Sequence, residues 1–376
     1  MSKKRTIDAY FGIPKAKKPR DSEPIALQDE STVLAISSCI PDDDNATSHL
    51  VVVNKETPCY TTHPSYPFPI PHLSGALEAD ISGPPARAAR AITDQPDLDL
   101  LYFDPYISRL ASRQLFEFLR AELPFYRVEY DIMRGATKTH IRTPRWTTVF
   151  GLDETARFET LHPSGSIPLS DPQSSIGRVV DARTGEPVPV GHIDTQGPRK
   201  QTGYKAMPRP IPHCLDMLRR STEMATGCQF NFCLVNYYAS GADSISFHSD
   251  DERFLGALPA IASFSLGAPR DFVMKHKPEP GETKMNGGSK APLKLPLMTG
   301  DMVLMRGTTQ ANWLHSIPKR TGKNEWDGGR INITFRRALV RGGTENYYQY
   351  NVGSGPVYKW NAAAQEMRPW MQVPKP

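Results

Sequence analysis

The sequence has few cysteines and no long apolar run. Its 376 residues include five Cys, an odd number, and none of them form a Cys-x-x-Cys pair. This predicts reduced, mostly structural thiols in an intracellular protein. No stretch of 18 apolar residues occurs, so we expect no membrane span. The excess of positive charge is also small, because 45 Lys and Arg against 40 Asp and Glu leave +5. That balance is compatible with a nucleic-acid partner but does not by itself indicate one.

Residues 1–95 lack periodic apolar faces and are rich in Pro, Ser, Asp and Ala. Such a composition predicts a mostly disordered tail, because too little apolar surface is available to offset the entropy of ordering. We therefore expect the folded domain over residues 96–345. Residues 346–376 are expected to form an extension that packs on the domain and has a loose end.

Two short motifs stand out in the predicted tail. In the first, residues 4–11, Ile7 precedes Tyr10 and Phe11 by three and four positions. One helical turn would press these three apolar side chains into a pocket. The motif resembles the one that docks on the replication sliding clamp (PCNA), with Lys4 in place of the usual Gln; a chance aromatic pair is the alternative. The second, the basic segment 15–20, predicts nuclear import and a nuclear protein, although it would also suit a solvated tail.

Two helices and a run of short strands are predicted beyond the tail. The first helix is expected from Asp104 as N-cap to Leu123, with an apolar stripe that includes Leu110, and the second over 212–225 with Gly227 as C-cap. Strands are expected over 229–238, 244–248, 260–266, 270–276, 293–296, 301–305 and 330–337, which favours a two-sheet sandwich or barrel. Residues 152–200 are rich in Gly, Pro and Ser and predict a long inserted loop.

The sequence His248-Ser249-Asp250 is a candidate metal site. In an extended strand, residues two apart face the same side, so this imidazole and carboxylate can converge on one ion. A lone His-x-Asp is usually an ordinary polar pair, but His315 offers a third ligand. Two His and one carboxylate form the facial triad of non-haem Fe(II) oxygenases.

The segment 330–336 alternates polar and apolar residues. Arg330, Asn332, Thr334 and Arg336 would share one face of a strand, and Ile331, Ile333 and Phe335 the other. An ordinary half-exposed strand is one interpretation. The other is a strand that turns two guanidiniums into a cavity, where they can hold the two carboxylates of a dicarboxylate cosubstrate.

Taken together, these residues resemble the AlkB-type Fe(II)- and 2-oxoglutarate-dependent dioxygenases, most of all the eukaryotic members that repair double-stranded DNA. The resemblance runs from about Leu100 to Val340, and its motifs are Asn236-x-Tyr238, Gly241-x-Asp243, His248-x-Asp250-Asp251-Glu252, Arg270-Asp271-Phe272-Val273, His315-Ser316 and Arg-x-Asn-x-Thr-x-Arg at 330–336. It implies a mainly β fold with flanking helices (α+β) around a double-stranded β-helix, or jelly-roll, core. It also implies Fe(II), 2-oxoglutarate as cosubstrate and dioxygen. The implied reaction is oxidative demethylation of 1-methyladenine and 3-methylcytosine in DNA, with release of formaldehyde, succinate and CO₂.

The resemblance also implies roles for individual residues. The metal ligands would be His248, Asp250 and His315. The cosubstrate would be held by Asn236, Tyr238, Arg330, Asn332, Thr334 and Arg336, with Arg330 on the distal carboxylate. A base must leave the stack to reach a buried oxidant, so the pocket needs an acceptor for the exocyclic amine and flat side chains. The candidate substrate residues are Glu252, Asp251, Phe150, Tyr204, Tyr126, Arg145 and Arg270, of which Phe150, Tyr204 and Tyr126 would stack on the base. The alternative for Glu252 is a solvated carboxylate in a turn.

Two other functions stay open at this point. One is a related oxygenase that acts on RNA or on a protein side chain. The other is a catalytically silent module that binds DNA or the clamp, which the complete triad disfavours. We expect a monomer whose partners are alkylated DNA, or alternatively RNA, and the sliding clamp.

Overall fold

A computed structural model describes residues 59–134, 137–159, 177–191, 203–278, 292–320, 329–352 and 355–371. The clamp motif with Ile7, Tyr10 and Phe11 and the basic segment 15–20 lie outside the described residues. Within the described ranges, no helix has the length and apolar character needed to cross a membrane.

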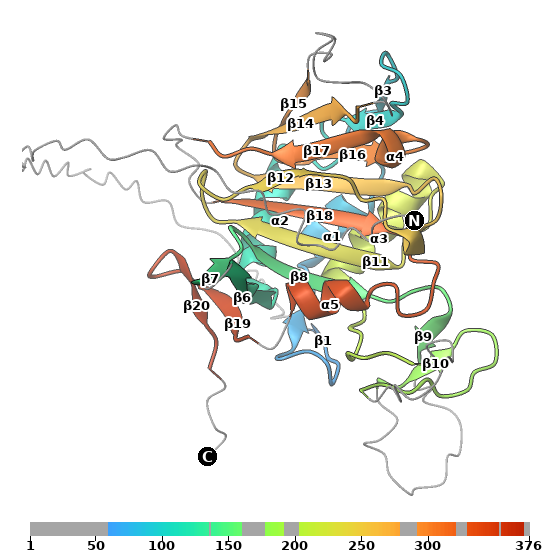
Figure 1. Ribbon diagram of the computed structural model, residues 1–376, viewed down its shortest axis with the longest axis vertical. Coiled ribbons are helices and arrows are strands. Elements are labelled where there is room, and N and C mark those ends of the chain that lie inside the picture. Colours follow the sequence, from blue (N-terminus) through green and yellow to red (C-terminus); the bar gives the residue numbers. More distant parts are fainter. Residues whose placement is uncertain are drawn as a thin grey trace, which may run out of the picture. The chain divides into compact units, whose positions relative to one another are not determined.

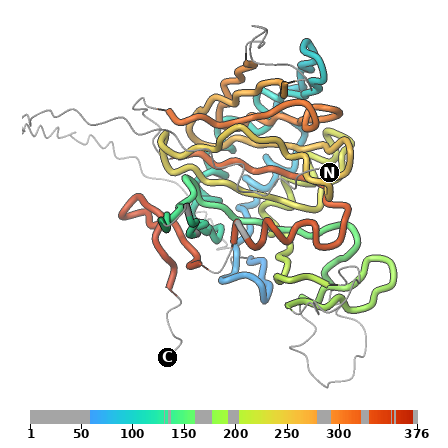
Figure 2. Tube along the Cα trace, in the orientation of Figure 1, coloured from blue at the N-terminus to red at the C-terminus, as the bar shows by residue number. Residues whose placement is uncertain are grey.

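The larger of two facing sheets has ten antiparallel strands (Figure 1). Figure 2 shows that its central strands come from distant parts of the chain, since green, yellow and orange segments run side by side there. In spatial order the strands are β20 (Glu366–Pro369), β19 (Val357–Asn361), β5 (Phe125–Tyr126), β8 (Trp146–Gly151), β11 (Phe232–Tyr238), β18 (Arg330–Arg336), β13 (Ile261–Gly267), β16 (Asp301–Met305), β4 (Leu100–Phe103) and β3 (Arg90–Ile92).

The smaller sheet has the strand order β12 (Ile245–His248), β17 (Trp313–Ile317), β14 (Arg270–His276) and β15 (Leu293–Leu297). An apolar cluster joins the two sheets, with Phe272, Met274 and Leu295 from the small sheet packed with Val303 and Met305 of β16. Two antiparallel sheets closed over a common core form the predicted jelly roll, and the predicted mainly β fold class is confirmed.

Three helices cover the other face of the large sheet: α1 (Gly75–Ser82), α2 (Arg109–Glu122) and α3 (His213–Thr226). Leu115, Leu119 and Leu218 of α2 and α3 are fully buried in one cluster with Phe264 and Ile333 of the sheet. The large sheet therefore has an apolar core on each face, and only one of those faces meets the small sheet.

The prediction for the first helix was wrong at its start. The helix begins after Ser108, whose side chain accepts a hydrogen bond from the Ala111 amide at 3.2 Å, and not after Asp104. That change moves Leu110 out of the buried stripe, and its side chain is 69% exposed. The second helix is confirmed: it ends at Gly227, whose φ of 69° is the left-handed conformation that glycine adopts readily.

The strand predictions are confirmed within three residues at each end, and those for β14 and β16 have the observed bounds. The sequence did not indicate β17, the strand that carries His315. The hairpin of β6 (Glu129–Arg134) and β7 (Thr137–Arg142), the 3₁₀ turn η2 (Arg253–Leu255) and the short helix α4 (Thr309–Asn312) complete the described core domain.

The predicted disordered tail was too long, because residues 59–95 are folded. They form α1, β3 and a small sheet of β1 (Tyr60–Thr61) and β2 (Ile70–Pro71). Ile70, Leu77 and Ile81 enter the core beneath α2 and α3, and the Tyr66 hydroxyl donates to the Pro210 carbonyl at 2.6 Å. The apolar side chains are sparse in this segment, but they lie at the positions that meet the helices.

Two further predictions of irregular structure need correction. The insertion 152–200 contains a paired β9 (Ala156–Phe158) and β10 (Val179–Asp181), which share an apolar cluster with Val188 and Tyr204. At the other end, residues after Ala362 are not loose throughout, since β20 pairs with β19. The extension packs on the domain through the helix α5 (Glu345–Asn351), whose Tyr348 is buried.

Candidate active site

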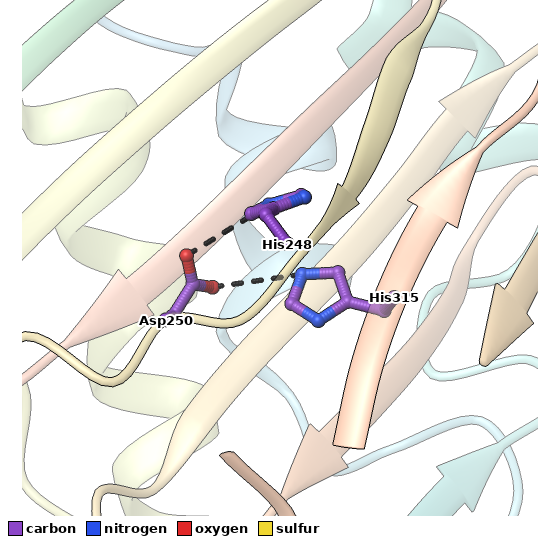
Figure 3. A group of neighbouring side chains, drawn as sticks. All are labelled: His248, Asp250 and His315. Carbon is purple, nitrogen blue, oxygen red and sulfur yellow. Dashed lines mark ion pairs between the residues drawn. The ribbon is translucent and has the colours of Figure 1, made fainter. Parts of the chain in front are cut away.

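His248, Asp250 and His315 lie together between the two sheets. One ligand atom from each lies within 4.8 Å of those of the other two. The Asp250 carboxylate oxygens are 3.9 Å from His248 Nε2 and 3.8 Å from His315 Nε2 (Figure 3). His315 is at the centre of β17 and directly opposite His248 in the ladder of β12 and β17. The strand β12 ends at His248, so Asp250 lies on the loop that follows and not on the same strand as we had predicted.

Neighbouring polar groups hold the His248 side chain and the backbone of Asp250. His248 Nδ1 lies 2.9 Å from the Ser246 carbonyl, and a proton on that nitrogen leaves the Nε2 lone pair directed toward Asp250. The Asp250 amide donates to the buried Oε1 of Gln310 in α4 at 2.9 Å. The loop that carries the carboxylate is therefore tied to the segment just before β17.

The protonation states of these ligands suit a cation. Burial, together with the neighbouring His248, lowers the pKa of His315 to about 3, and burial also lowers the pKa of His248. Burial alone would raise the pKa of Asp250, but Arg336 and the two histidines more than offset it and lower that pKa. Two neutral imidazoles and one carboxylate are the donors of a facial Fe(II) triad, so the residues fit this metal.

The polar face of β18 is buried, as the second of our two interpretations predicted. Its apolar residues Ile331, Ile333 and Phe335 belong to the core beneath the helices, so the polar face points toward the small sheet. On that face Arg330, Asn332, Thr334 and Arg336 are each between 1% and 9% exposed. No part of this strand faces water.

Arg330 and Arg336 fit an anionic ligand. Arg330 is 1% exposed and donates through Nη2 to the Ser265 hydroxyl at 2.8 Å. Its Nε and Nη1, and Nε of Arg336, are buried and make no hydrogen bond to any described residue. Burial lowers the pKa of Arg330 to about 10, so it stays charged at neutral pH. Buried donors on a cation call for an anionic acceptor, and a dicarboxylate supplies one at each end.

The other predicted cosubstrate residues surround these arginines. Tyr238 lies against Arg330, with 5.4 Å between the guanidinium carbon and the ring centre. Asn236 accepts a hydrogen bond from Arg145 Nε at 3.2 Å. Asn332 donates to the Ser263 hydroxyl at 2.9 Å, and the Thr334 hydroxyl donates to the Leu234 carbonyl at 3.1 Å. The structure thus brings Arg145 and all six of these residues to one polar lining.

Glu252 lies beside this lining in the first turn after the metal loop. It precedes η2 and is half-buried, so the solvated-carboxylate alternative is wrong. Its Oε1 accepts a hydrogen bond from the Tyr347 hydroxyl, while its Oε2 is buried and bonds to no described group. Burial, reinforced by Asp250, raises the pKa of Glu252. The adjacent Asp251 is exposed and pairs with Lys277 at 3.0 Å.

The three aromatic residues predicted to stack on a base are buried away from the candidate active site, so this prediction was wrong. Phe150 is fully buried beneath the helices, with its ring edge-on to Tyr66. Tyr204 is in the core of the insertion and donates to Asp153 at 2.8 Å. Tyr126 is 6% exposed and accepts a hydrogen bond from Arg209. None of these rings presents a face on which a base could stack.

Arg270 is also not available to a substrate. It is 5% exposed, and its Nη2 donates to the carbonyls of Asp243 at 2.8 Å and Pro318 at 2.6 Å. Its guanidinium is 5.8 Å from the ring centre of Tyr238, on which Arg330 also rests. Arg270 therefore joins the loops that carry Asp243 and Pro318.

Three residues of the site were missed by the sequence analysis. Gln310 and Ser265 gave no signal, because polar residues in a turn and in a strand are common. Tyr347 belongs to an aromatic run that predicted only packing. Its contact with Glu252 joins segments 95 residues apart, which no local pattern reveals.

Comparison with known proteins agrees with this geometry. Residues 99–336 match the model of the 2OG-Fe(II) oxygenase superfamily. Over 132 residues the chain is 43% identical to "Alpha-ketoglutarate-dependent dioxygenase alkB homolog 3" of Rattus norvegicus, covering 34% of this chain and 43% of that protein. Over 139 residues it is 38% identical to "DNA oxidative demethylase ALKBH2" of Homo sapiens, covering 37% of this chain and 51% of that protein. The matches thus span about half the length of these curated relatives. The chain belongs to the 2OG-Fe(II) oxygenase superfamily.

Proposed function

We propose that this protein is an oxidative demethylase of alkylated DNA bases, with 1-methyladenine and 3-methylcytosine as substrates. The observation that carries the proposal is the cluster of His248, Asp250 and His315 between the sheets. Beside it lie Arg330, Arg336 and Glu252, and each of these three side chains has at least one buried polar atom without a hydrogen-bond partner among the described residues. Similarity to proteins named as DNA oxidative demethylases supports the choice of substrate.

Different residues of this chain would bind the metal and the cosubstrate. His248, Asp250 and His315 would hold Fe(II), and Arg330 and Arg336 would bind the two carboxylates of 2-oxoglutarate. With dioxygen, Fe(II) and 2-oxoglutarate together supply the oxidising chemistry that hydroxylates an N-methyl carbon. The apolar cluster that joins the sheets reaches this site, since the rings of Phe272 and His315 lie 5.3 Å apart.

Glu252 would read the base. An N-methyl group on the pairing edge is inaccessible in a stacked duplex, so the nucleotide must be flipped out. Adenine and cytosine both carry an exocyclic amine, and the unpaired Glu252 Oε2 is an acceptor for it. Recognition by one carboxylate would admit both bases. The same requirement would exclude bases that lack the amine.

A turnover assay tests the proposal. Duplex and single-stranded DNA oligonucleotides carrying 1-methyladenine or 3-methylcytosine are compared with methylated RNA of the same sequence, with formaldehyde and repaired base as readouts. We expect repair of DNA. Turnover of RNA alone, or of no nucleic acid while succinate is still released, would replace this function with the RNA or protein alternative.

We also propose a nuclear location and a tether to the sliding clamp, with the enzyme acting as a monomer. The support is the spacing of Ile7, Tyr10 and Phe11 and the basic segment 15–20 directly after them. A short apolar turn ahead of the enzyme would deliver it to newly replicated DNA.

A further inference from the structure

The helix α5 lies beyond residues 99–336, which match the superfamily, yet it reaches the active site. It packs on Val149, Phe232 and Leu234, the residues of β8 and β11 that face away from the covering helices. In Figure 1 it is in front of β8, whereas α1, α2 and α3 lie behind the sheet. The C-terminal extension therefore forms part of the wall on the side of the metal centre.

Tyr347 is the residue of α5 that enters the site. Its ring packs edge-on against Phe232, with ring centres 5.3 Å apart, and against Phe254 at 6.0 Å. The Arg336 guanidinium carbon is 5.1 Å from the Tyr347 ring centre. Aromatic packing on two sides leaves the hydroxyl little freedom of position.

The Tyr347 hydroxyl joins two groups that face different ligands. It accepts a hydrogen bond from Arg336 Nη1 and donates one to Glu252 Oε1. Arg336 in turn contacts Asp250 through Nη2 at 3.0 Å. Each of the joined side chains keeps one buried atom unpaired: Nε of Arg336 and Oε2 of Glu252. Because each side chain is held by Tyr347 and still has an unpaired buried atom, that atom is free to form a hydrogen bond with a ligand.

We propose that Tyr347 is a positioning residue that holds Arg336 for 2-oxoglutarate and Glu252 for the substrate base. Its hydroxyl fixes both groups at once, so cosubstrate binding and base recognition share one support from outside the matched domain. The base half of this inference rests on the proposed function. The cosubstrate half rests only on the family chemistry and can be tested without DNA.

The chain offers a matched control at the next position. The Tyr348 hydroxyl donates to the Gly151 carbonyl at 2.5 Å and accepts from the Arg209 amide at 2.9 Å, so it contacts only backbone. Tyr347→Phe and Tyr348→Phe each remove one hydroxyl from α5 and keep the ring. If both tyrosines merely stabilise the helix, the two variants will behave alike in every binding assay.

The test measures binding of 2-oxoglutarate to the full chain loaded with Mn(II) by calorimetry, with thermal unfolding alongside. Arg336 keeps its pair with Asp250 and loses only its hydrogen bond to the Tyr347 hydroxyl, so we expect Tyr347→Phe to weaken 2-oxoglutarate binding by about three- to tenfold. Tyr348→Phe should bind 2-oxoglutarate as the wild type does, even though its midpoint of unfolding falls. Equal 2-oxoglutarate affinity in both variants would overturn the proposal.

A double variant tests the link to Glu252. If Tyr347 acts on the base through this carboxylate, Tyr347→Phe with Glu252→Gln should raise KM for methylated DNA no further than Glu252→Gln alone. Additive effects would overturn the link. A protein that turns over no DNA at all would disprove the proposed substrate, while the calorimetric result would still decide the role of Tyr347.

Discussion

Arg336 forms an ion pair with Asp250 at 3.0 Å, and both side chains are almost fully buried. An arginine that neutralises a metal ligand also fixes the direction of its carboxylate. The pair leaves Asp250 as the negatively charged member of the triad, while Arg336 Nε is buried and has no hydrogen-bond partner among the described residues. In the proposed function, this one contact would couple metal binding to cosubstrate binding.

Removal of any triad residue should abolish metal binding. Loss of a residue that only supports a metal ligand typically lowers metal affinity about 10- to 100-fold. Loss of a ligand itself should cost more, so we expect Mn(II) affinity to fall by more than about 100-fold, and turnover to stop, in each of His248→Ala, Asp250→Ala and His315→Ala. Calorimetry with Mn(II) measures the first effect and thermal unfolding shows that the domain remains folded. His276→Ala, whose imidazole pairs with Asp97 at 3.2 Å, is the control. Demethylation retained by any of the three variants would disprove the assignment.

Gln310 should affect metal affinity without contacting the metal. Gln310→Leu removes the acceptor of the Asp250 amide, and we expect roughly tenfold weaker Mn(II) binding because the carboxylate loop loses its tie. Asn312→Leu changes an exposed amide in the same short helix and should bind Mn(II) normally. Equal affinities in the two variants would show that the loop is held by other contacts.

Arg330 should affect the cosubstrate alone. A lysine cannot present two donors in a plane, so Arg330→Lys should raise the 2-oxoglutarate dissociation constant roughly tenfold, or about 1.4 kcal/mol. Arg337→Lys is the matched control, since Arg337 is beside the same strand and pairs on the surface with Glu154 at 2.8 Å. The measurement is 2-oxoglutarate binding to the Mn(II) form. A wild-type constant for Arg330→Lys would mean that another group holds the carboxylate.

Glu252 should affect the nucleic-acid substrate. Glu252→Ala should raise KM or lower kcat on methylated DNA at least roughly tenfold, since a hydrogen bond to a charged group is worth about 1.5–3 kcal/mol. Fe(II) and 2-oxoglutarate should still bind. Glu154→Ala, on the surface, is the control. Wild-type kinetics would mean that the base is read elsewhere.

The clamp motif can be separated from catalysis. Tyr10→Ala together with Phe11→Ala should lose clamp binding in a calorimetric titration and keep full activity on free oligonucleotides, because two of three apolar anchors are removed. Tyr60→Ala, an exposed tyrosine outside the motif, is the control. Unchanged clamp affinity in the double variant would rule the motif out.

Much of the strand at 330–336 could be predicted because its sequence is unusual. Charged and polar residues alternate with Ile and Phe over 330–336, and both faces of the strand proved to be buried. The His-x-Asp spacing likewise brought the ligands together, although the strand ends between them. Charged and polar residues are rarely buried without a partner, so their roles can be predicted from sequence more readily than those of apolar residues.

The aromatic side chains could not be assigned in this way. Phe150 and Tyr347 are equally suitable for a core or for a base, and only the packing of distant segments decides between them. Phe150 faces the helices because β8 presents it opposite Cys233 on the inner side. Tyr347 faces the site because α5 crosses the other side. The folded part of 59–95 was missed for a similar reason, since a few apolar residues among prolines are enough when helices are there to receive them.

The position of β18 has a consequence for synthesis of the chain. It pairs with β11 on one side and β13 on the other, and it leaves the ribosome after both. Until it arrives, those two buried strands each keep an unpaired edge, which invites pairing with other chains. A nascent chain that stops before Arg330 would therefore aggregate and not persist as an inactive, folded protein. On this expectation, a chain that lacks β18 would lose its solubility together with Arg330 and Arg336, the residues proposed to bind the cosubstrate.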